Sequence, residues 1–171
     1  AGVTTGALYK RYKGKEDLFC AVVDQTVKDL YEVAHSRGDR DPAAMSDAEL
    51  IKAWDMDGPD MMWWMRFLYD RHDDFVLLLS RSDGTRYANF QHDWVAVLTN
   101  ATSAFLAEAQ RRGICRTDVG PEELHILLSA FWTTIYEPFI HGFDWEQIEQ
   151  HCRIVCKLFN WHKALEFHVE K

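Results

Sequence analysis

The spacing of apolar side chains most strongly limits the folds open to this chain. These side chains recur at steps of three and four residues, as on one face of a helix, and no stretch alternates every second residue as a half-buried strand would. Gly and Pro are scarce, with 9 and 4 copies in 171 residues, and they fall where helices should stop. We therefore expect an all-α fold, with helices over residues 15–36, 46–57, 60–71, 72–81 and 87–112, followed by two that open at Pro121 and Asp144.

Charge is distributed unevenly along the chain. Residues 1–15 hold four basic side chains, Lys10, Arg11, Lys13 and Lys15, and no acidic one. The whole chain has 19 basic and 27 acidic residues, which leaves 15 basic against all 27 acidic ones for the remainder. Nucleic acid repels so acidic a body but attracts the basic N-terminal strip. We expect any contact with DNA to be confined to the N-terminus.

Features of a membrane or secreted protein are missing from the sequence. Even the longest uninterrupted apolar runs, such as Phe75 to Leu79, are far shorter than the roughly 20 residues that a membrane-spanning helix needs. The chain begins without the charged and then apolar layout of a secretion signal. Its four cysteines lack the paired spacing of a disulfide framework. These features favour a cytoplasmic protein with reduced thiols and no membrane span.

The last two helices carry apolar arcs that are too wide for a single core. In the final helix a second apolar stripe runs beside the first, rotated by about 100°, and the preceding helix repeats this pattern. A helix that packs on one core needs only one stripe, so we expect both to cover a second copy in a two-fold four-helix bundle. Alternatively, both helices are deeply buried within one subunit. The predicted homodimer interface consists of Leu128, Trp132, Ile154, Leu158, Trp161 and Leu165.

A short central region is crowded with aromatic and methionine side chains. Such side chains at mixed helical spacing are usually core, but adaptable pockets for apolar ligands are built from the same residues. We predict a pocket for a small apolar or aromatic effector in this region, with two polar side chains orienting the ligand. The predicted lining is Trp54, Met61, Trp64 and Phe67, and the polar groups are His92 and Tyr136.

The first residues predict a short helix that presents a distinctive outer surface. Gly2 permits a tight turn, and Thr4 is a suitable N-cap for a helix over residues 5–12. Leu8 and Tyr12 are four residues apart and so face inward together. The small residues Gly6 and Ala7 would let this helix approach another molecule closely.

The segment from Ala1 to Phe19 resembles the second half of the helix-turn-helix of TetR-family transcriptional regulators. It keeps the family's turn, its Leu-Tyr pair, an aromatic residue, two lysines and a Leu-Phe pair at the family's spacing. These matches are Gly2, Val3, Leu8, Tyr9, Tyr12, Lys13, Lys15, Leu18 and Phe19. Beyond this segment the resemblance is architectural, to an acidic helical body that ends in two dimer-forming helices.

The resemblance implies which residues contact DNA. In this family the short helix enters the major groove, Tyr9 matches a tyrosine that donates to a phosphate, and Lys15 matches a lysine that contacts backbone phosphate beside a helix N-terminus. Only Lys10 and Arg11 offer strong donors to guanine. The implied DNA-binding residues are Thr4, Thr5, Gly6, Ala7, Tyr9, Lys10, Arg11 and Lys15.

The resemblance also implies a domain organisation and a mechanism. Residues 1–36 would form part of a DNA-binding domain and its connecting helix, and residues 37–171 a ligand-binding and dimerisation domain. The family's pattern also includes about 30 preceding residues that form the first two helices of the DNA-binding domain, and relative to it we expect either an N-terminal segment that this sequence omits or a truncation. Two such domains must lie about 34 Å apart to engage operator DNA. An effector that prefers another spacing would release a repressor from its operator.

Other functional classes are less well supported by the sequence. There is no nucleophile elbow, phosphate-binding glycine loop or metalloprotease helix, so we expect a protein that is not an enzyme. The acidic and histidine residues over 70–74, and the group His151, Cys152 and Cys156, are simpler to explain as a helix start and as core residues than as metal sites. We expect no metal or cofactor. The main alternative is a dimeric helical small-molecule sensor that does not bind DNA.

Overall fold

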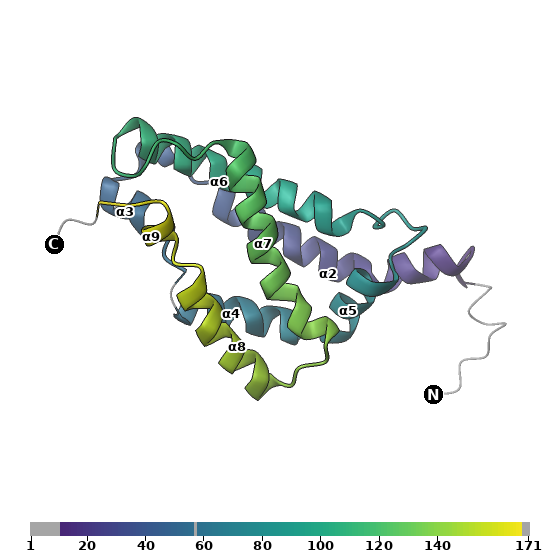
Figure 1. Cartoon of the computed structure of the whole chain (residues 1–171). Coiled ribbons are helices and arrows are strands. Elements are labelled where there is room, and N and C mark those ends of the chain that lie inside the picture. Colours follow the sequence, from purple (N-terminus) through teal and green to yellow (C-terminus); the bar gives the residue numbers. More distant parts are fainter. Residues whose placement is uncertain (1–10, 57, 169–171) are drawn as a thin grey trace.

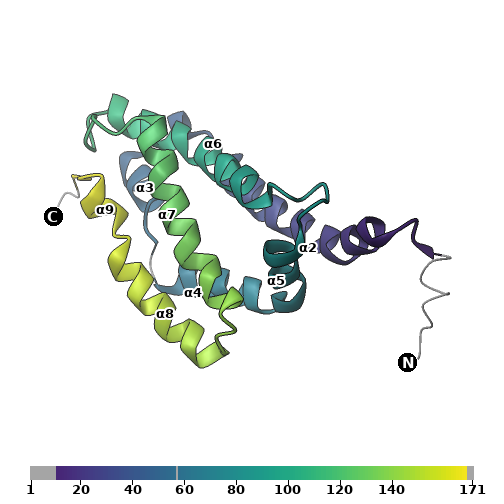
Figure 2. The ribbon, with the colours of Figure 1, turned by 45° about the vertical axis from the view of Figure 1, so that its right-hand side comes forward.

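The chain is all-α in the computed structural model, which describes residues 11–56 and 58–168. No strand occurs in those two ranges. Helix α7 lies in the centre, with α2 and α6 on one side of it and α4 and α8 on the other (Figures 1 and 2). The elements are α2 (Lys15–Gly38), the 3-10 helix η1 (Pro42–Ala44), α3 (Asp47–Lys52), α4 (Gly58–Tyr69), α5 (His72–Arg81), α6 (Phe90–Arg111), α7 (Pro121–Ile140), α8 (Trp145–Leu158) and α9 (Trp161–Ala164).

Helix α2 is the long amphipathic helix expected from the sequence. Its buried residues Val23, Val27, Leu30 and Ala34 recur at steps of three and four and pack into the core. Near the end of the helix, a Cβ atom added to Gly38 would lie 3.3 Å from the Cβ atom of Ala101. The glycine therefore lets α2 approach α6 more closely than a larger residue would.

Local capping signals set the starts of two helices as expected. The Ser46 side chain accepts from the amide of Glu49, and the Glu49 carboxylate accepts from the amide of Ser46. Asp144 and Gln147 make the same reciprocal pair at the start of α8. Helix α3 ends at Lys52, however, and not near residue 57, because the chain turns there and buries Trp54 in the core.

The long final helix expected from Asp144 is broken in two. Helix α8 ends at Leu158, Phe159 adopts φ −98° and ψ 65°, and the Asn160 side chain accepts from the amide of Lys163 to start α9. Trp161 and Leu165 thus leave the face that they would occupy on a continuous helix. They turn into the core, where they are 5% and 0% exposed.

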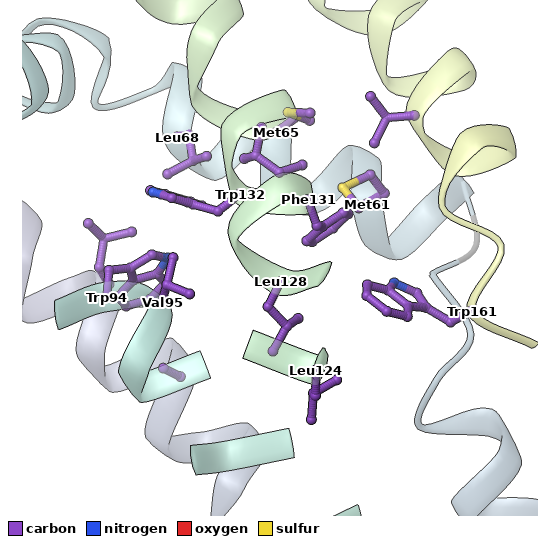
Figure 3. Packing of buried hydrophobic residues seen from close by; sticks show 14 of the residues in the cluster. Met61, Met65, Leu68, Trp94, Val95, Leu124, Leu128, Phe131, Trp132 and Trp161 are labelled. Carbon is purple, nitrogen blue, oxygen red and sulfur yellow. The ribbon is translucent and has the colours of Figure 1, made fainter. Parts of the chain in front are cut away.

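The core is rich in large aromatic side chains from several helices. Trp132 of α7 lies between Leu68 of α4 and Trp94 of α6, with ring centroids of the two tryptophans 5.6 Å apart (Figure 3). Phe131 of the same helix packs on Trp161 of α9, with a centroid distance of 6.0 Å. Helix α7 therefore ties the two sides of the body together.

None of the helices within the described ranges combines the length and the apolar character that crossing a membrane would require.

Candidate functional site

Most of the predicted DNA contacts fall on residues that the structure does not describe. Thr4, Thr5, Gly6, Ala7, Tyr9 and Lys10 lie outside the described residues. Arg11 and Lys15 lie within them, and both are exposed. The expected contacts of this segment therefore stay predictions, and the geometry bears only on the helix that follows it.

The start of α2 stands away from the body of the molecule. Figures 1 and 2 both show its first turns extending beyond α5, at the end of the molecule opposite α9. The amide of Lys13 donates to Asp17 Oδ2 at 3.0 Å, and the Leu18 amide donates to the Gly14 carbonyl, so the first turn is closed by local hydrogen bonds. Lys15 thus occupies an exposed position at a helix N-terminus, where backbone amides favour anions.

An ion pair anchors the middle of α2 to the start of α5. The Arg71 guanidinium donates to Asp29 Oδ2 through Nη2 at 2.7 Å and through Nε at 2.9 Å. This contact, with a hydrogen bond from Gln25, lowers the pKa of the Asp29 carboxyl. The same guanidinium lies 3.9 Å from the centroid of the Phe67 ring and donates to the Phe67 carbonyl. One residue thus connects α2 with an aromatic side chain of α4.

A second polar contact ties α2 to the loop between α5 and α6. Asp24 accepts from Arg86 and from the Tyr87 hydroxyl, the latter at 2.8 Å. Desolvation raises the pKa of Asp24, but the hydrogen bonds from Arg86 and Tyr87 outweigh it and leave the pKa below its usual value. Any displacement of α5 or of this loop would therefore act on α2 through two ion pairs.

Four of the six residues predicted for a homodimer interface cannot serve in it. Leu128, Trp132, Trp161 and Leu165 are only 6%, 2%, 5% and 0% exposed within the single chain. These four side chains belong to the buried core of the single chain, so they are not available to a second copy. Ile154 and Leu158 are the remaining two, and they are 56% and 68% exposed.

Helix α7 contributes an exposed apolar stripe that the sequence prediction missed. Ile126 and Ile140 are 61% and 39% exposed, and the small exposed residues Ala130 and Thr133 lie between them at helical spacing. The His151 ring of α8 donates to the Thr134 carbonyl of α7 at 2.8 Å, so the two helices are adjacent here. We call the set Ile126, Ala130, Thr133, Ile140, Ile154 and Leu158 the α7–α8 outer face.

The residues predicted to line one effector pocket are divided among several places. Trp64 and Phe67 stack with a centroid distance of 5.3 Å and an interplanar angle of 9°, and Trp64 also stacks on Trp94 at 6.2 Å. Tyr136 packs on Trp132, with a centroid distance of 5.6 Å. These three predicted residues therefore border one aromatic region, formed around Trp94 and Trp132.

The other three predicted pocket residues lie elsewhere. Met61 is buried in the core, and His92 is exposed, with its ring 6.2 Å from that of His125. Trp54 packs on Trp161 and Phe167 near the C-terminal end of the described chain, with centroid distances of 6.0 and 6.1 Å. Residues that are close together in the sequence therefore do not line a single pocket in the structure.

Three buried tryptophans carry unpartnered donors. The Nε1 atoms of Trp54, Trp94 and Trp132 are buried and have no hydrogen-bond partner in the described part of the chain. An indole N–H can only donate, and a buried donor without an acceptor is unfavourable. Each of these donors therefore lowers the stability that the aromatic core would otherwise have.

Three of the four cysteines, Cys20, Cys115 and Cys152, are buried, and Cys156 is half-buried. Burial, and then the neighbouring Cys156, raise the pKa of Cys152 to about 12. Burial also raises the pKa of Cys115. Among the described residues, no three His, Cys, Asp or Glu side chains are grouped so that they could hold a metal ion.

Comparison with known proteins does not assign the chain to a family. No family model matches it, and no curated protein and no solved structure matches it either.

Proposed function

We propose that the chain is part of a DNA-binding transcriptional regulator of the TetR type, which acts by binding and not by catalysis. It would be a repressor that a small apolar or aromatic effector releases from operator DNA. The observation that carries the proposal is the sequence from Gly2 to Phe19, whose residue types and spacing resemble the second half of the family's helix-turn-helix, together with the start of a long helix at Lys15. The acidic body confines attraction for DNA to that end of the chain.

The course of α2 supports a role in transmitting a signal. One helix of 24 residues begins beside the predicted DNA contacts and then crosses the body against α5 and α6. Since a helix moves as a stiff rod, a shift where Asp29 meets Arg71 would tilt the exposed end. The spacing between two DNA-binding segments would change with that tilt, and operator affinity depends on the spacing.

The α7–α8 outer face supports a homodimer as the functional form. Exposed Ile126, Ile154 and Leu158 are costly in water, and covering them with the same face of a second copy would bury all three on each side. The small residues Ala130 and Thr133 would allow close approach of the two α7 helices. We propose this face in place of the interface predicted from the sequence.

DNA binding by the full-length protein tests the proposal. Binding to DNA from upstream of its own gene is measured over a range of salt concentrations for the wild type, Lys15→Ala and Tyr9→Phe. Lys15→Ala should weaken binding to all DNA sequences similarly and reduce the salt slope by about one unit, because one phosphate contact is lost. Tyr9→Phe should weaken binding by removing a donor to phosphate.

The matched control is Lys28→Ala, which removes an exposed lysine from the same helix over the body. Its affinity and salt slope should equal those of the wild type. If Lys15→Ala and Tyr9→Phe also leave binding unchanged, or if no DNA binding occurs, the chain is better described as a helical small-molecule sensor without DNA binding.

A further inference from the structure

Two histidine side chains from neighbouring helices lie close together at the surface. The ring of His92, in the first turn of α6, is 6.2 Å from the ring of His125 in α7, by centroid distance. His92 is exposed and His125 is half-buried, so solvent reaches both rings. Within the described part of the chain, His92 makes no hydrogen bond and neither ring makes an ion pair. The pair therefore has nitrogen lone pairs that no protein group uses.

A hydrogen bond determines which nitrogen of His125 carries the hydrogen. The Thr99 hydroxyl of α6 donates its single hydrogen to the Val95 carbonyl at 2.8 Å, so its oxygen can only accept a further bond. His125 Nδ1 lies 3.1 Å from this oxygen and is therefore the donor. The Nε2 atom of the neutral ring then keeps a free lone pair. Metal-binding histidines are generally held in this way, by a bond that their other ring nitrogen donates.

The position of His125 along α6 turns this lone pair toward His92. Thr99 and His92 are seven residues apart on α6, which corresponds to about 10.5 Å along the helix axis. The His125 ring contacts Thr99 through Nδ1 and lies 6.2 Å from the His92 ring, so it occupies the space between the two. Because Nδ1 points to Thr99, the edge of the ring that carries Nε2 is turned away from Thr99 and toward His92.

The spacing and the surrounding charge both suit a metal cation. An ion bound about 2.0–2.1 Å from one nitrogen of each ring holds the two ring centres roughly 5–6.5 Å apart, a range that includes the observed 6.2 Å. Asp93, Glu122 and Glu123 are close to the pair in the sequence, and residues 88–110 and 117–130 contain no lysine or arginine, so a cation is favoured. No third His, Cys, Asp or Glu of the described residues completes the group, which leaves the other coordination positions to water.

We propose that His92 and His125 bind one divalent transition-metal ion between α6 and α7, with water molecules as its other ligands. Imidazole nitrogen suits Ni²⁺ and Zn²⁺, whereas Mg²⁺ prefers oxygen ligands. The bound ion links the first turn of α6 to α7. The site is separate from the predicted DNA contacts, and its existence does not depend on the proposed regulatory function.

Isothermal titration calorimetry of the full chain, without an affinity tag, tests the proposal with Ni²⁺ and with Mg²⁺ as a matched probe of equal charge. Ni²⁺ should bind and Mg²⁺ should not, because an acidic surface attracts both ions but imidazole distinguishes them. His92→Ala and His125→Ala should each weaken Ni²⁺ binding about tenfold or more, since each removes one of the two protein ligands. The control His35→Ala removes an exposed histidine that packs on Tyr31, and it should leave Ni²⁺ binding unchanged.

Two substitutions of Thr99 test its role as a positioning residue. Thr99→Val keeps the shape of the side chain but removes the oxygen that accepts from His125, and it should weaken Ni²⁺ binding about tenfold. Thr99→Ser retains the hydroxyl and should bind Ni²⁺ as tightly as the wild type. Near-ultraviolet circular dichroism checks that the variants keep their packing. In long-range proton–nitrogen spectra of the wild type, Zn²⁺ should shift the Nε2 signal of His125, while Nδ1 stays protonated.

Several results would overturn the proposal. They are absence of Ni²⁺ binding at millimolar concentration, equal binding of Mg²⁺, full Ni²⁺ affinity in either histidine variant, and an equal loss of affinity in His35→Ala. Zn²⁺ bound to Nδ1 of His125 would exclude the proposed orientation of the ring as well.

Discussion

Replacing Leu158 with alanine should weaken the proposed homodimer about 30-fold. Complete burial of a leucine side chain contributes about 1.5–3 kcal/mol, and 68% of Leu158 is exposed in the single chain, so covering it is worth about 1–2 kcal/mol. Two-fold symmetry counts this contribution twice, giving about 2–4 kcal/mol for each dimer. Alanine retains a minor part of the apolar surface, which leaves a loss of about 2 kcal/mol.

Sedimentation equilibrium over a wide range of protein concentrations measures the dissociation constant of the dimer. Leu128→Ala is the control, because Leu128 is 6% exposed and belonged to the interface predicted from sequence. It should lower the melting temperature by creating a cavity, without a comparable change in the dissociation constant. A Leu158→Ala dimer as tight as the wild type, or a wild type that remains monomeric, would refute the assignment of the outer face.

Three further outcomes follow from local contacts. The pKa of Asp29 is lower in the folded than in the unfolded state, so the ionised carboxylate stabilises the fold above its unfolded pKa, and this stabilisation is lost as pH falls through the folded pKa. Asp29→Asn should therefore remove this part of the acid dependence of the free energy of unfolding, measured with denaturant. Asp144→Ala removes the cap of α8 and should cost about 1 kcal/mol in thermal unfolding. Iodoacetamide should alkylate half-buried Cys156 before buried Cys152, whose pKa is raised to about 12, as peptide mass spectrometry would record; the reverse order would contradict the burial.

Local signals in the sequence predicted the helices well. The limits of α5 over residues 72–81 are the predicted ones, and α2 starts at Lys15 as expected. The starts of α3 and α8 follow from side chains that bond to amides three residues away, which is a property of a few neighbouring residues. Such features are visible in one sequence because no distant contact decides them.

Tertiary packing decided what the sequence left open. The apolar residues of the last helix keep their helical spacing through Phe159, so the sequence pattern does not show that the helix ends there. The break is explained by a tertiary contact, the packing of Trp161 against Phe131. Periodicity shows that α7 has two apolar sides, but it does not show which side α6 covers. Ile126 was missed because the stripe around it includes alanine and threonine and so lacks a strong apolar pattern.

The candidate pocket was misjudged for a related reason. Trp54 and Trp64 are ten residues apart, but the turn after α3 carries Trp54 to Trp161 while α4 carries Trp64 to Trp94. Composition indicated aromatic side chains suited to ligand binding. It could not show that they would serve two separate regions, because that division depends on where the chain turns.

Because the last helix breaks between α8 and α9, the residues that follow the break return to the body and hold two earlier segments in place. Residues 161–168 reach back to α3 through the hydrogen bond from His162 to Ile51, and to the segment after α6 through the Arg116 amide to the Leu165 carbonyl and the His168 amide to the Ile114 carbonyl. His162 and Ile51 are 111 residues apart in the sequence. Hydrogen bonds thus connect residues 161–168 both with α3 and with the segment after α6. They should open and close as one cooperative unit, with amide hydrogens of α3 exchanging at the rate of those near the C-terminus.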